Sequence, residues 1–317
     1  MTVGAALDAI GRAVSGLLAR ESLGDDVCVA LSGGPDSTAL LLGARHVGLT
    51  VTALVVDHGM QDGSAEVARS AARTAVDLGA QAQVMTVDVD GPGGPEAAAR
   101  RARYAALDEA RVGRPVLLGH TLDDQAETVL VGLARGSGPR SIAGMVAWDE
   151  PWGRPLLATR RATTVAACAE AGLTPWADPH NDDPRFLRSR VRAELVPVMQ
   201  TVLGAAVVPA LARTADLVRD DLDALDAVAA AASETVVVDG AVVRSELVAL
   251  PRAIRRRVLR RWLIDGGASE VTAPLLAAVD DLADDTAHGA VAVGGDVDVR
   301  VNAVADGGLL RLRRDRR

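Results

Sequence analysis

Short apolar runs alternate with helical patterns between residues 27 and 120. The runs have the length of buried strands, and the stretches between them repeat apolar residues at the spacing of an α-helix. This alternation predicts an α/β fold in which a parallel sheet carries helices on both faces. The predicted strands are 27–32, 51–58, 82–89 and 114–120, and the predicted helices are 38–46, 64–78 and 96–111.

Polar residues close three of these predicted strands: Ser32, the pair Asp57 and His58, and the pair Gly119 and His120. The carboxyl ends of parallel strands share one edge of a sheet, and ligands bind beyond that edge. We therefore expect a single site there.

Beyond residue 204 the pattern predicts a second domain. Apolar residues recur at helical spacing from 207 to 225, and a helix over 252–265 stops at paired glycines. Apolar runs separated by Gly-Gly and Asp-Gly turns predict short strands near the end of the chain. We expect a catalytic domain over residues 1–210 and a smaller, mostly helical domain with a C-terminal β-hairpin over residues 211–317.

The chain is acidic but contains no lysine, which narrows the chemistry of any anion site. The formal net charge is −8, and all 34 basic residues are arginines. A Walker A loop needs a lysine, so that class is excluded, and anions must bind to guanidinium or backbone N–H groups. Aromatic residues make up only 2% of the chain, which disfavours nucleic-acid recognition by stacking on aromatic side chains.

The two cysteines, Cys28 and Cys168, have no metal-ligand spacing and are expected as free thiols. The first 20 residues have an amphipathic helical pattern and lack the features of a signal peptide. No run is apolar and long enough to span a membrane. We expect a soluble, cytoplasmic protein.

The segment Ser-Gly-Gly-Pro-Asp-Ser, residues 32–37, joins a buried strand to a helix start. Gly33 and Gly34 let a ligand approach the backbone closely, and the free N–H groups of a helix N-terminus favour an anion. A carboxylate repels phosphate, so Asp36 suits this site if it holds a Mg²⁺ ion. The alternative is an ordinary tight turn in which Asp36 or Ser37 is the N-cap residue.

A second polar block, residues 119–128, follows the fourth predicted strand. Asp124 and Glu127 fall on neighbouring turns of a helix start, with Asp123 beside them. Paired carboxylates bind Mg²⁺, or bind and deprotonate an ammonium group. The alternative is a helix start enriched in acids because of the helix dipole, but the glycine-rich loop at the same sheet edge favours a functional site.

Two arginine-rich blocks complete the candidate set. Residues 96–104 place Arg100 and Tyr104 on one helix face. Residues 178–192 hold four arginines that suit phosphate binding, although a solvated basic face is the alternative for both blocks. The four are Arg185, Arg188, Arg190 and Arg192.

The segment 32–37 resembles the pyrophosphate-binding PP-loop of the N-type ATP pyrophosphatases, and the four blocks together resemble the tRNA(Ile)-lysidine synthase family. The resemblance covers about residues 25–200, and more weakly 250–263. Its motifs here are Val-Asp-His-Gly (56–59), Glu-x-x-Ala-Arg-x-x-Arg-Tyr (96–104), Gly-His-x-x-Asp-Asp-x-x-Glu-Thr (119–128) and Asp-x-x-Asn-x-Asp-x-x-Phe-x-Arg-x-Arg-Val-Arg (178–192). The sequence departs from the family at Gln61, where a basic residue is expected nearby, and at Ser189, where asparagine is expected. It also lacks the C-terminal extension of longer members.

The resemblance implies an ATP-dependent ligase that joins free L-lysine to C2 of the wobble cytidine in a CAU-anticodon tRNA(Ile), with ATP and Mg²⁺ as cofactors and a homodimer as a possible assembly. The implied catalytic residues are Asp36, Asp124, Glu127, Arg100 and Arg192. The implied nucleotide-binding residues are Ser32, Gly33, Gly34, Pro35, Asp36, Ser37, His58 and His120, although either histidine is also explained as a packed turn residue. Asp36 and Asp123 are implied for Mg²⁺, and Arg185, Arg188, Arg190, Arg192, Arg255 and Arg256 for tRNA.

Two alternatives stay open from the sequence. One is another PP-loop adenylating enzyme, which would need paired cysteines for tRNA thiolation or a glutaminase partner for amide synthesis. The other is a nucleotide-binding regulator without catalysis, which the intact acids at 123, 124 and 127 disfavour.

Overall fold

The structure is a computed structural model that describes residues 4–59, 63–90, 94–136, 138–176, 183, 185–268, 271–283, 289–294, 299–306 and 308–316. The chain divides into two compact units, Met1–Ala215 and Asp216–Arg317. The division falls inside the long helix α10 (Val207–Val236). Gln61 and most of the predicted motif segment 178–184 lie outside the described residues.

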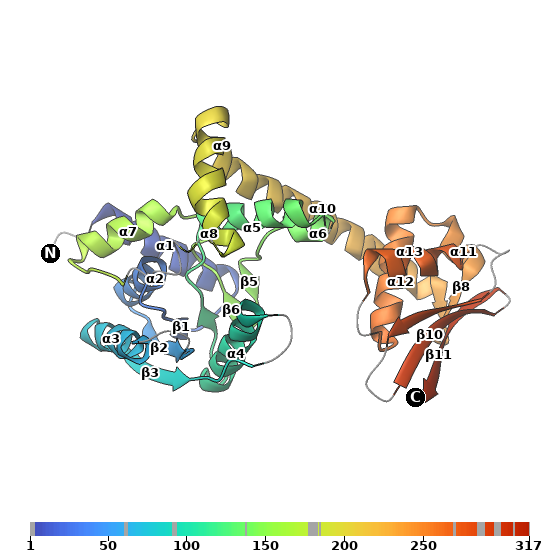
Figure 1. The fold of residues 1–317 in the computed structure, drawn as a ribbon, viewed down its shortest axis with the longest axis horizontal. Helices are drawn as coiled ribbons and strands as arrows, with labels where there is room; N and C mark the ends of the chain where they lie inside the picture. The colour runs from blue at the N-terminus through green and yellow to red at the C-terminus, as the bar shows by residue number, and fades with distance from the viewer. Residues whose placement is uncertain are drawn as a thin grey trace. The chain divides into compact units, whose positions relative to one another are not determined.

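The first unit contains a six-stranded sheet in the order β3-β2-β1-β4-β6-β5 (Figure 1). Five strands are parallel, and β5 pairs antiparallel with β6 at one edge. The predicted parallel α/β class is confirmed, whereas the β5–β6 pair was not predicted because strands of two residues have no detectable period. The strands are β1 (Asp26–Ala30), β2 (Thr50–Asp57), β3 (Gln81–Thr86), β4 (Val116–Leu117), β5 (Trp148–Asp149) and β6 (Trp152–Gly153).

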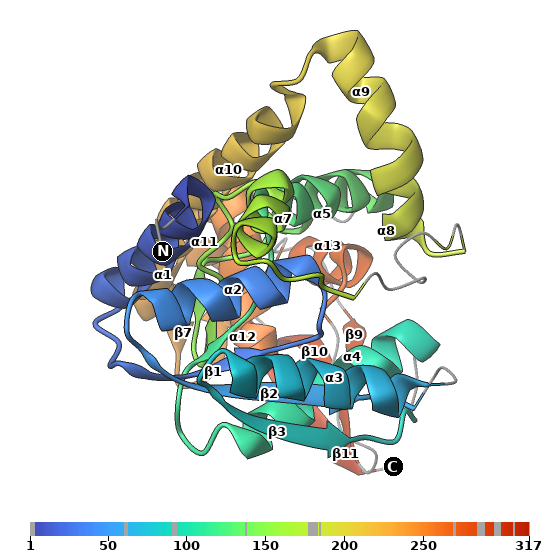
Figure 2. The ribbon, with the colours of Figure 1, turned by 90° about the vertical axis from the view of Figure 1, so that its left-hand side faces the viewer.

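Alternate strand residues face opposite sides of this sheet, which gives it two apolar cores. Val27 and Val29 belong to the larger core with residues of α1, α2, α3 and α7, whereas Cys28 and Ala30 pack with Leu107 of α4. Figure 2 shows α1, α2 and α7 gathered together. The helices are α1 (Ala5–Arg20), α2 (Pro35–His46), α3 (Ser64–Asp77), α4 (Pro95–Ala110), α5 (Leu122–Arg135), α6 (Pro139–Ile142), α7 (Arg161–Glu170), α8 (Leu187–Arg190), the π-helical turn η2 (Val191–Leu195) and α9 (Val196–Leu203).

The end of β4 lies directly against the start of α2. A Cβ atom on Gly119 would come within 3.0 Å of backbone atoms of Asp36 and Ser37. Only glycine allows this approach without a shift of the backbone. The two predicted blocks, 32–37 and 119–128, are therefore brought to one edge of the sheet.

The second unit has a five-stranded antiparallel sheet in the order β7-β8-β11-β10-β9. The predicted helix that stops at paired glycines is α12, which ends before Gly266. Its apolar side packs with Val242 of the sheet through Leu259 and Leu263. The elements are β7 (Val237–Val238), β8 (Ala241–Val243), α11 (Arg244–Ala249), α12 (Arg252–Asp265), α13 (Ala273–Asp281), β9 (Ala290–Gly294), β10 (Val299–Asp306) and β11 (Leu309–Arg316).

Within the described ranges, no single helix has both the length and the apolar composition to cross a membrane. One bent pair of helical segments, Leu187–Leu203 with Val207–Val236, meets those two criteria together.

Candidate functional site

The glycine-rich loop between β1 and α2 has one position that requires glycine. Gly33 has a φ of +84°, in the left-handed region that favours glycine. Gly34 has an ordinary extended conformation and is the N-cap residue of α2, without a side-chain cap. The alternative interpretation expected Asp36 or Ser37 as the N-cap residue, and neither occupies that position.

The serines of the loop fix its shape. Ser37 Oγ accepts a hydrogen bond from the Ser32 N–H at 3.2 Å and donates to the Gly34 carbonyl at 3.1 Å. The two serine hydroxyls lie 3.1 Å apart. On the other side of the loop, the Trp176 N–H donates to the Gly33 carbonyl at 3.0 Å.

Three carboxylates meet at the start of α2 and the first turns of α5, and we call Asp36, Asp124 and Glu127 the acid cluster. All three contact the guanidinium of Arg161, the first residue of α7. The distances are 3.1 Å from Nε to Asp36 Oδ2, 2.6 Å from Nη2 to Asp124 Oδ1 and 3.3 Å from Nη1 to Glu127 Oε1. The structure thus brings Asp36 of the glycine-rich loop together with Asp124 and Glu127 of the second polar block.

Asp124 has a structural role in addition to its place in the cluster. Its Oδ2 accepts a hydrogen bond from the Thr121 N–H, and its own N–H donates to Thr121 Oγ1, which together form a capping box at the start of α5. The Thr121 hydroxyl also donates to Asp124 Oδ2. Burial disfavours the charge on Asp124, but Arg161 and the bonds from Thr121 outweigh burial and lower its pKa. Burial raises the pKa of Asp36, although Thr164 and Arg161 oppose that shift.

Two of the four arginines in the segment 178–192, all of them predicted to bind tRNA, contact residues of α5. Arg192, in the π-helical turn, donates to Glu127 at 2.8 and 3.1 Å, and Arg188 donates to Thr128 at 3.3 Å. The side chains of Arg185 and Arg190 are 79% and 55% exposed. Residues four apart on a helix share a face, which explains the pairing of 188 with 192.

Asp123 accepts several hydrogen bonds that join α5 to the start of α7. Its carboxylate binds the Arg160 guanidinium at 3.0 to 3.2 Å and the Arg161 backbone N–H at 2.8 Å. Asp123, which was predicted to share a metal ion with Asp36, is therefore already hydrogen-bonded to Arg160 and Arg161.

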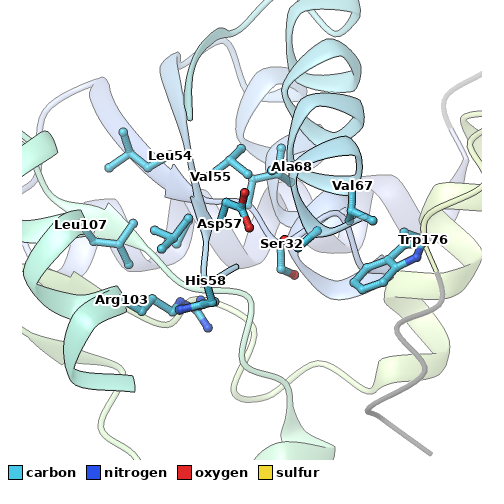
Figure 3. Close-up of a pocket in the computed structure, with 14 residues that line it drawn as sticks. Ser32, Leu54, Val55, Asp57, His58, Val67, Ala68, Arg103, Leu107 and Trp176 are labelled. Atoms are coloured by element: carbon cyan, nitrogen blue, oxygen red, sulfur yellow. The ribbon is translucent and has the colours of Figure 1, made fainter. Parts of the chain in front are cut away.

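A cavity of about 250 Å³ adjoins the glycine-rich loop. Figure 3 shows Ser32 between His58 and Arg103 on one side and Trp176 on the other. Apolar residues of β2, α3 and α4 supply much of the remaining wall, including Leu54, Val67 and Leu107. An apolar cleft with a few polar groups beside an anion-binding loop has the character of a nucleotide pocket.

The two candidate histidines are neutral and each has a buried, unpartnered nitrogen. Burial lowers the pKa of His58, and burial with the nearby arginines lowers that of His120 to about 3. Nδ1 of each ring has no hydrogen-bond partner among the described residues. Such atoms are rare in folded proteins, and of these two residues His58 is among those that line the cavity.

Three further predicted residues, Arg100, Arg255 and Arg256, contact side chains close to them in the fold, outside the acid cluster. Arg100 stacks over Tyr104 of α4, with its Cζ 4.8 Å from the ring centre. Arg255 and Arg256 both pair with the buried carboxylate of Asp280 on α13, Arg256 at 3.1 Å. Their guanidinium groups are therefore partly used within the second unit.

Sequence reasoning missed Arg160, Arg161, Thr164 and Trp176. Thr164 is fully buried and donates to the Asp36 carboxylate. A usable signal existed for the arginines: Arg160 and Arg161 stand at the start of α7, where the helix dipole disfavours positive charge. Two cations in that position indicate anionic partners elsewhere in the fold.

Two family descriptions match the chain: a PP-loop domain over residues 10–199 and a TilS substrate binding domain over residues 243–316. The chain is 56% identical over 271 residues to the tRNA(Ile)-lysidine synthase of Rhodococcus erythropolis, covering 85% of this chain and 83% of that protein. It is 57% identical over 271 residues to that of Mycolicibacterium paratuberculosis, covering 84% and 83%.

Among solved structures, the fold is similar to that of the U34-tRNA thiolase NcsA from Methanococcus maripaludis with its [4Fe-4S] cluster. The TM-score is 0.54 at 18% identity, and the match covers 68% of this chain and 80% of the thiolase. At that identity the likeness concerns the fold alone.

Proposed function

The chain belongs to the tRNA(Ile)-lysidine synthase family, and from this premise we propose that it uses ATP to join lysine to the wobble cytidine of the CAU-anticodon tRNA(Ile). The C2 oxygen of the cytidine attacks the α-phosphate of ATP and releases pyrophosphate. The ε-amine of lysine then attacks C2 and displaces AMP, which leaves lysidine. Both steps need a site that neutralises phosphate charge next to a site that holds an amine.

One observation carries the proposal: the loop carboxylate Asp36 and the helix carboxylates Asp124 and Glu127 contact the same guanidinium. A triphosphate on the N–H groups at the start of α2 and an amine on Asp124 and Glu127 would therefore meet within one site. The loop Ser32–Ser37 is proposed to hold the pyrophosphate part of ATP. His58 lines the adjoining cavity and offers an unpartnered Nδ1 to the nucleotide, and the same role is proposed for His120.

The loop offers Mg²⁺ one carboxylate, Asp36, whose oxygens accept hydrogen bonds from Arg161 and Thr164. Mg²⁺ is commonly held by one or two carboxylates together with substrate phosphates, so this carboxylate fits the ion when a nucleotide is bound. Asp36 would hold the ion, which supplies neutralisation of phosphate charge when bound. For Asp123 the role of metal ligand stays a prediction, because four hydrogen bonds already join its carboxylate to α7.

Asp124 and Glu127 are proposed to bind the lysine ammonium group and to take its proton. A free lysine amine has a pKa of about 10.4, so neutralising it at pH 7 costs roughly 4–5 kcal/mol. A carboxylate that only pairs with the ammonium stabilises the charged form, so one of the two must also accept the proton. Arg192 orients Glu127 through two hydrogen bonds, and Arg100 stays a candidate for the lysine carboxylate or a phosphate.

Transfer of sulfur is a weaker candidate for this chain. Cys28 and Cys168 are free thiols that belong to separate cores on opposite faces of the sheet. They are not placed to share a cluster or a persulfide.

The test is incubation of the protein with ATP, labelled lysine and bulk tRNA. We expect label on one tRNA species and one AMP for each lysine incorporated, and Glu127→Gln should abolish the label while the protein stays folded. If AMP forms but the tRNA carries no label, lysine is not the amine that reacts with the activated cytidine. Assembly as a homodimer is a separate prediction, tested by light scattering.

A further inference from the structure

Arg161 holds the position in the acid cluster where the proposed function requires other cations. Each of its three guanidinium nitrogens contacts a different carboxylate: Asp36 from α2, and Asp124 and Glu127 from α5. Burial opposes the charge on Arg161, but the three carboxylates outweigh burial and raise its pKa. The guanidinium is thus a fixed positive charge at the centre of the cluster.

The position of Arg161 in its helix does not explain this placement. Arg161 begins α7, where the helix dipole disfavours a cation, and its backbone N–H is held by Asp123. Thr164, one turn later, donates to Asp36 and to the Arg161 carbonyl. The start of α7 is therefore positioned so that this side chain reaches the cluster.

Arg192 already shares Asp124 Oδ1 and Glu127 Oε1 with Arg161, so a further cation on these oxygens would lie close to the Arg161 guanidinium and be repelled by it. The proposed ligands of this site include two cations: the metal at Asp36, and the lysine ammonium at Asp124 and Glu127. Like charges at such distances repel strongly in a partly buried site. The Arg161 side chain is 21% exposed, so it has a path toward solvent or toward the phosphates of a bound nucleotide.

Because both ligands compete with one side chain, displacement of Arg161 by the first removes the obstacle to the second. A displacement cost that two ligands share makes their binding positively coupled, and the coupling is reciprocal by thermodynamic necessity. Arg192 does not bridge the two places in this way, because its contacts are to Asp124 and Glu127 of α5.

We propose that Arg161 is a positioning residue that occupies the cation site of the acid cluster and couples nucleotide binding to lysine binding. This inference rests on the proposed function, since it takes lysine and Mg²⁺–ATP as the ligands. The inference assigns a role to Arg161 and predicts an order of binding: a nucleotide at the loop displaces Arg161, and lysine then binds to Asp124 and Glu127.

The experiment is calorimetric titration of L-lysine into the full-length protein, with and without α,β-methylene ATP and Mg²⁺. For the unmodified chain we expect the nucleotide analogue to strengthen lysine binding about five-fold or more. Arg161→Gln should bind lysine more tightly without the analogue, and the ratio between the two conditions should fall toward one. Arg73→Gln removes one exposed arginine that pairs with Glu66 of α3, outside the cluster, and should keep the original ratio.

The reciprocal titration needs no variant, since lysine should strengthen binding of the analogue by the same factor. Arg161→Lys restores a cation that cannot contact three carboxylates at once, and it should recover part of the coupling. The inference is overturned if Arg161→Gln keeps the full ratio, or if it weakens lysine binding, which would make Arg161 a direct ligand of the lysine carboxylate. If lysine binds none of these proteins under either condition, the lysine assignment itself fails and the inference fails with it.

Discussion

Arg192 binds Glu127 through two hydrogen bonds across 65 residues of sequence, with Nε 2.8 Å from Oε1 and Nη2 3.1 Å from Oε2. The Glu127 side chain is only 3% exposed, and it contacts the guanidinium groups of both Arg192 and Arg161. Arg192 belongs to a π-helical turn, a rare element that is frequently found at functional sites.

We expect Arg192→Ala to lower lysidine formation by about 10²-fold, because Glu127 would lose the partner that orients it. The melting temperature should also fall, since a buried carboxylate would lose one of its two guanidinium partners. Arg192→Lys keeps the charge but not the two-pronged contact, and it should recover stability more than activity. Turnover with bulk tRNA and thermal melts measure the two effects. Wild-type turnover in the alanine variant would contradict the role of Arg192.

The two loop glycines should respond differently to alanine. Gly33→Ala places a side chain at a φ of +84° and should cost about 1–2 kcal/mol of folding free energy. At Gly34 the φ is ordinary and a Cβ would meet Ser32 Oγ at 3.6 Å, so Gly34→Ala should cost less than Gly33→Ala, roughly the 0.5–1 kcal/mol by which alanine is disfavoured at an N-cap. If the Gly34 backbone approaches the triphosphate, that variant should nevertheless bind α,β-methylene ATP at least ten-fold more weakly. Normal nucleotide affinity in a stable Gly34→Ala would reject this use of the loop.

Stability should decrease as the pH falls below about 6.5. The folded pKa of His120 is about 3, whereas an unfolded histidine has a pKa of about 6.5. Between these values the unfolded state binds a proton that the folded state does not, so acid favours unfolding by up to ~1.4 kcal/mol for each pH unit. His58, whose pKa is also lowered, contributes with the same sign. Urea denaturation at pH 7.5 and 5.5 should show a smaller loss for His120→Gln than for the unmodified chain, and an equal loss would contradict the assignment.

Replacing Arg255 and Arg256 together should destabilise the second unit. Both bind Asp280, whose side chain is 4% exposed, and removing both would leave a buried carboxylate unpaired at a cost of about 3–5 kcal/mol. Adding Asp280→Asn to the double variant should recover much of that loss in thermal melts. Weak tRNA binding by the double variant could therefore result from its lower stability. Arg252→Ala, at the exposed start of α12, tests the role of that helix in tRNA binding without removing a partner of Asp280. Unchanged stability in the double variant would contradict the structural role.

Arg185 and Arg190 are the exposed members of the basic segment and should bind tRNA phosphates. Replacing both by alanine should reduce the slope of log affinity against log salt by about one for each residue. Both guanidinium groups are mostly exposed, although Asp183 itself is only 15% exposed, so we expect the melting temperature to change little. Filter binding at several salt concentrations measures the slope, with ATP affinity as the control. An unchanged slope would place the tRNA elsewhere.

The parallel sheet and its functional edge were predictable because strand and helix periods are local properties of the chain. The loop at 32–37 and the acids at 124 and 127 were found for the same reason, since each motif is short and continuous. The β5–β6 pair was not predictable, because two residues per strand carry no period. The contacts of Arg188 and Arg192 with α5 were predictable only in part. Their spacing of four residues indicates a shared helix face, but it does not show what that face contacts.

By itself, the sequence determined the α/β class, the anion-binding loop and the family resemblance, all of which depend on residues close together in the chain. Only the tertiary structure decided which cation meets which carboxylate. Arg161 lies 125 residues from Asp36 and 34 from Glu127, and it reaches both because Gly119 lets the end of β4 pack against α2 while Asp123 holds the start of α7. An ion pair depends on distance in space, and no local pattern of residues encodes that distance.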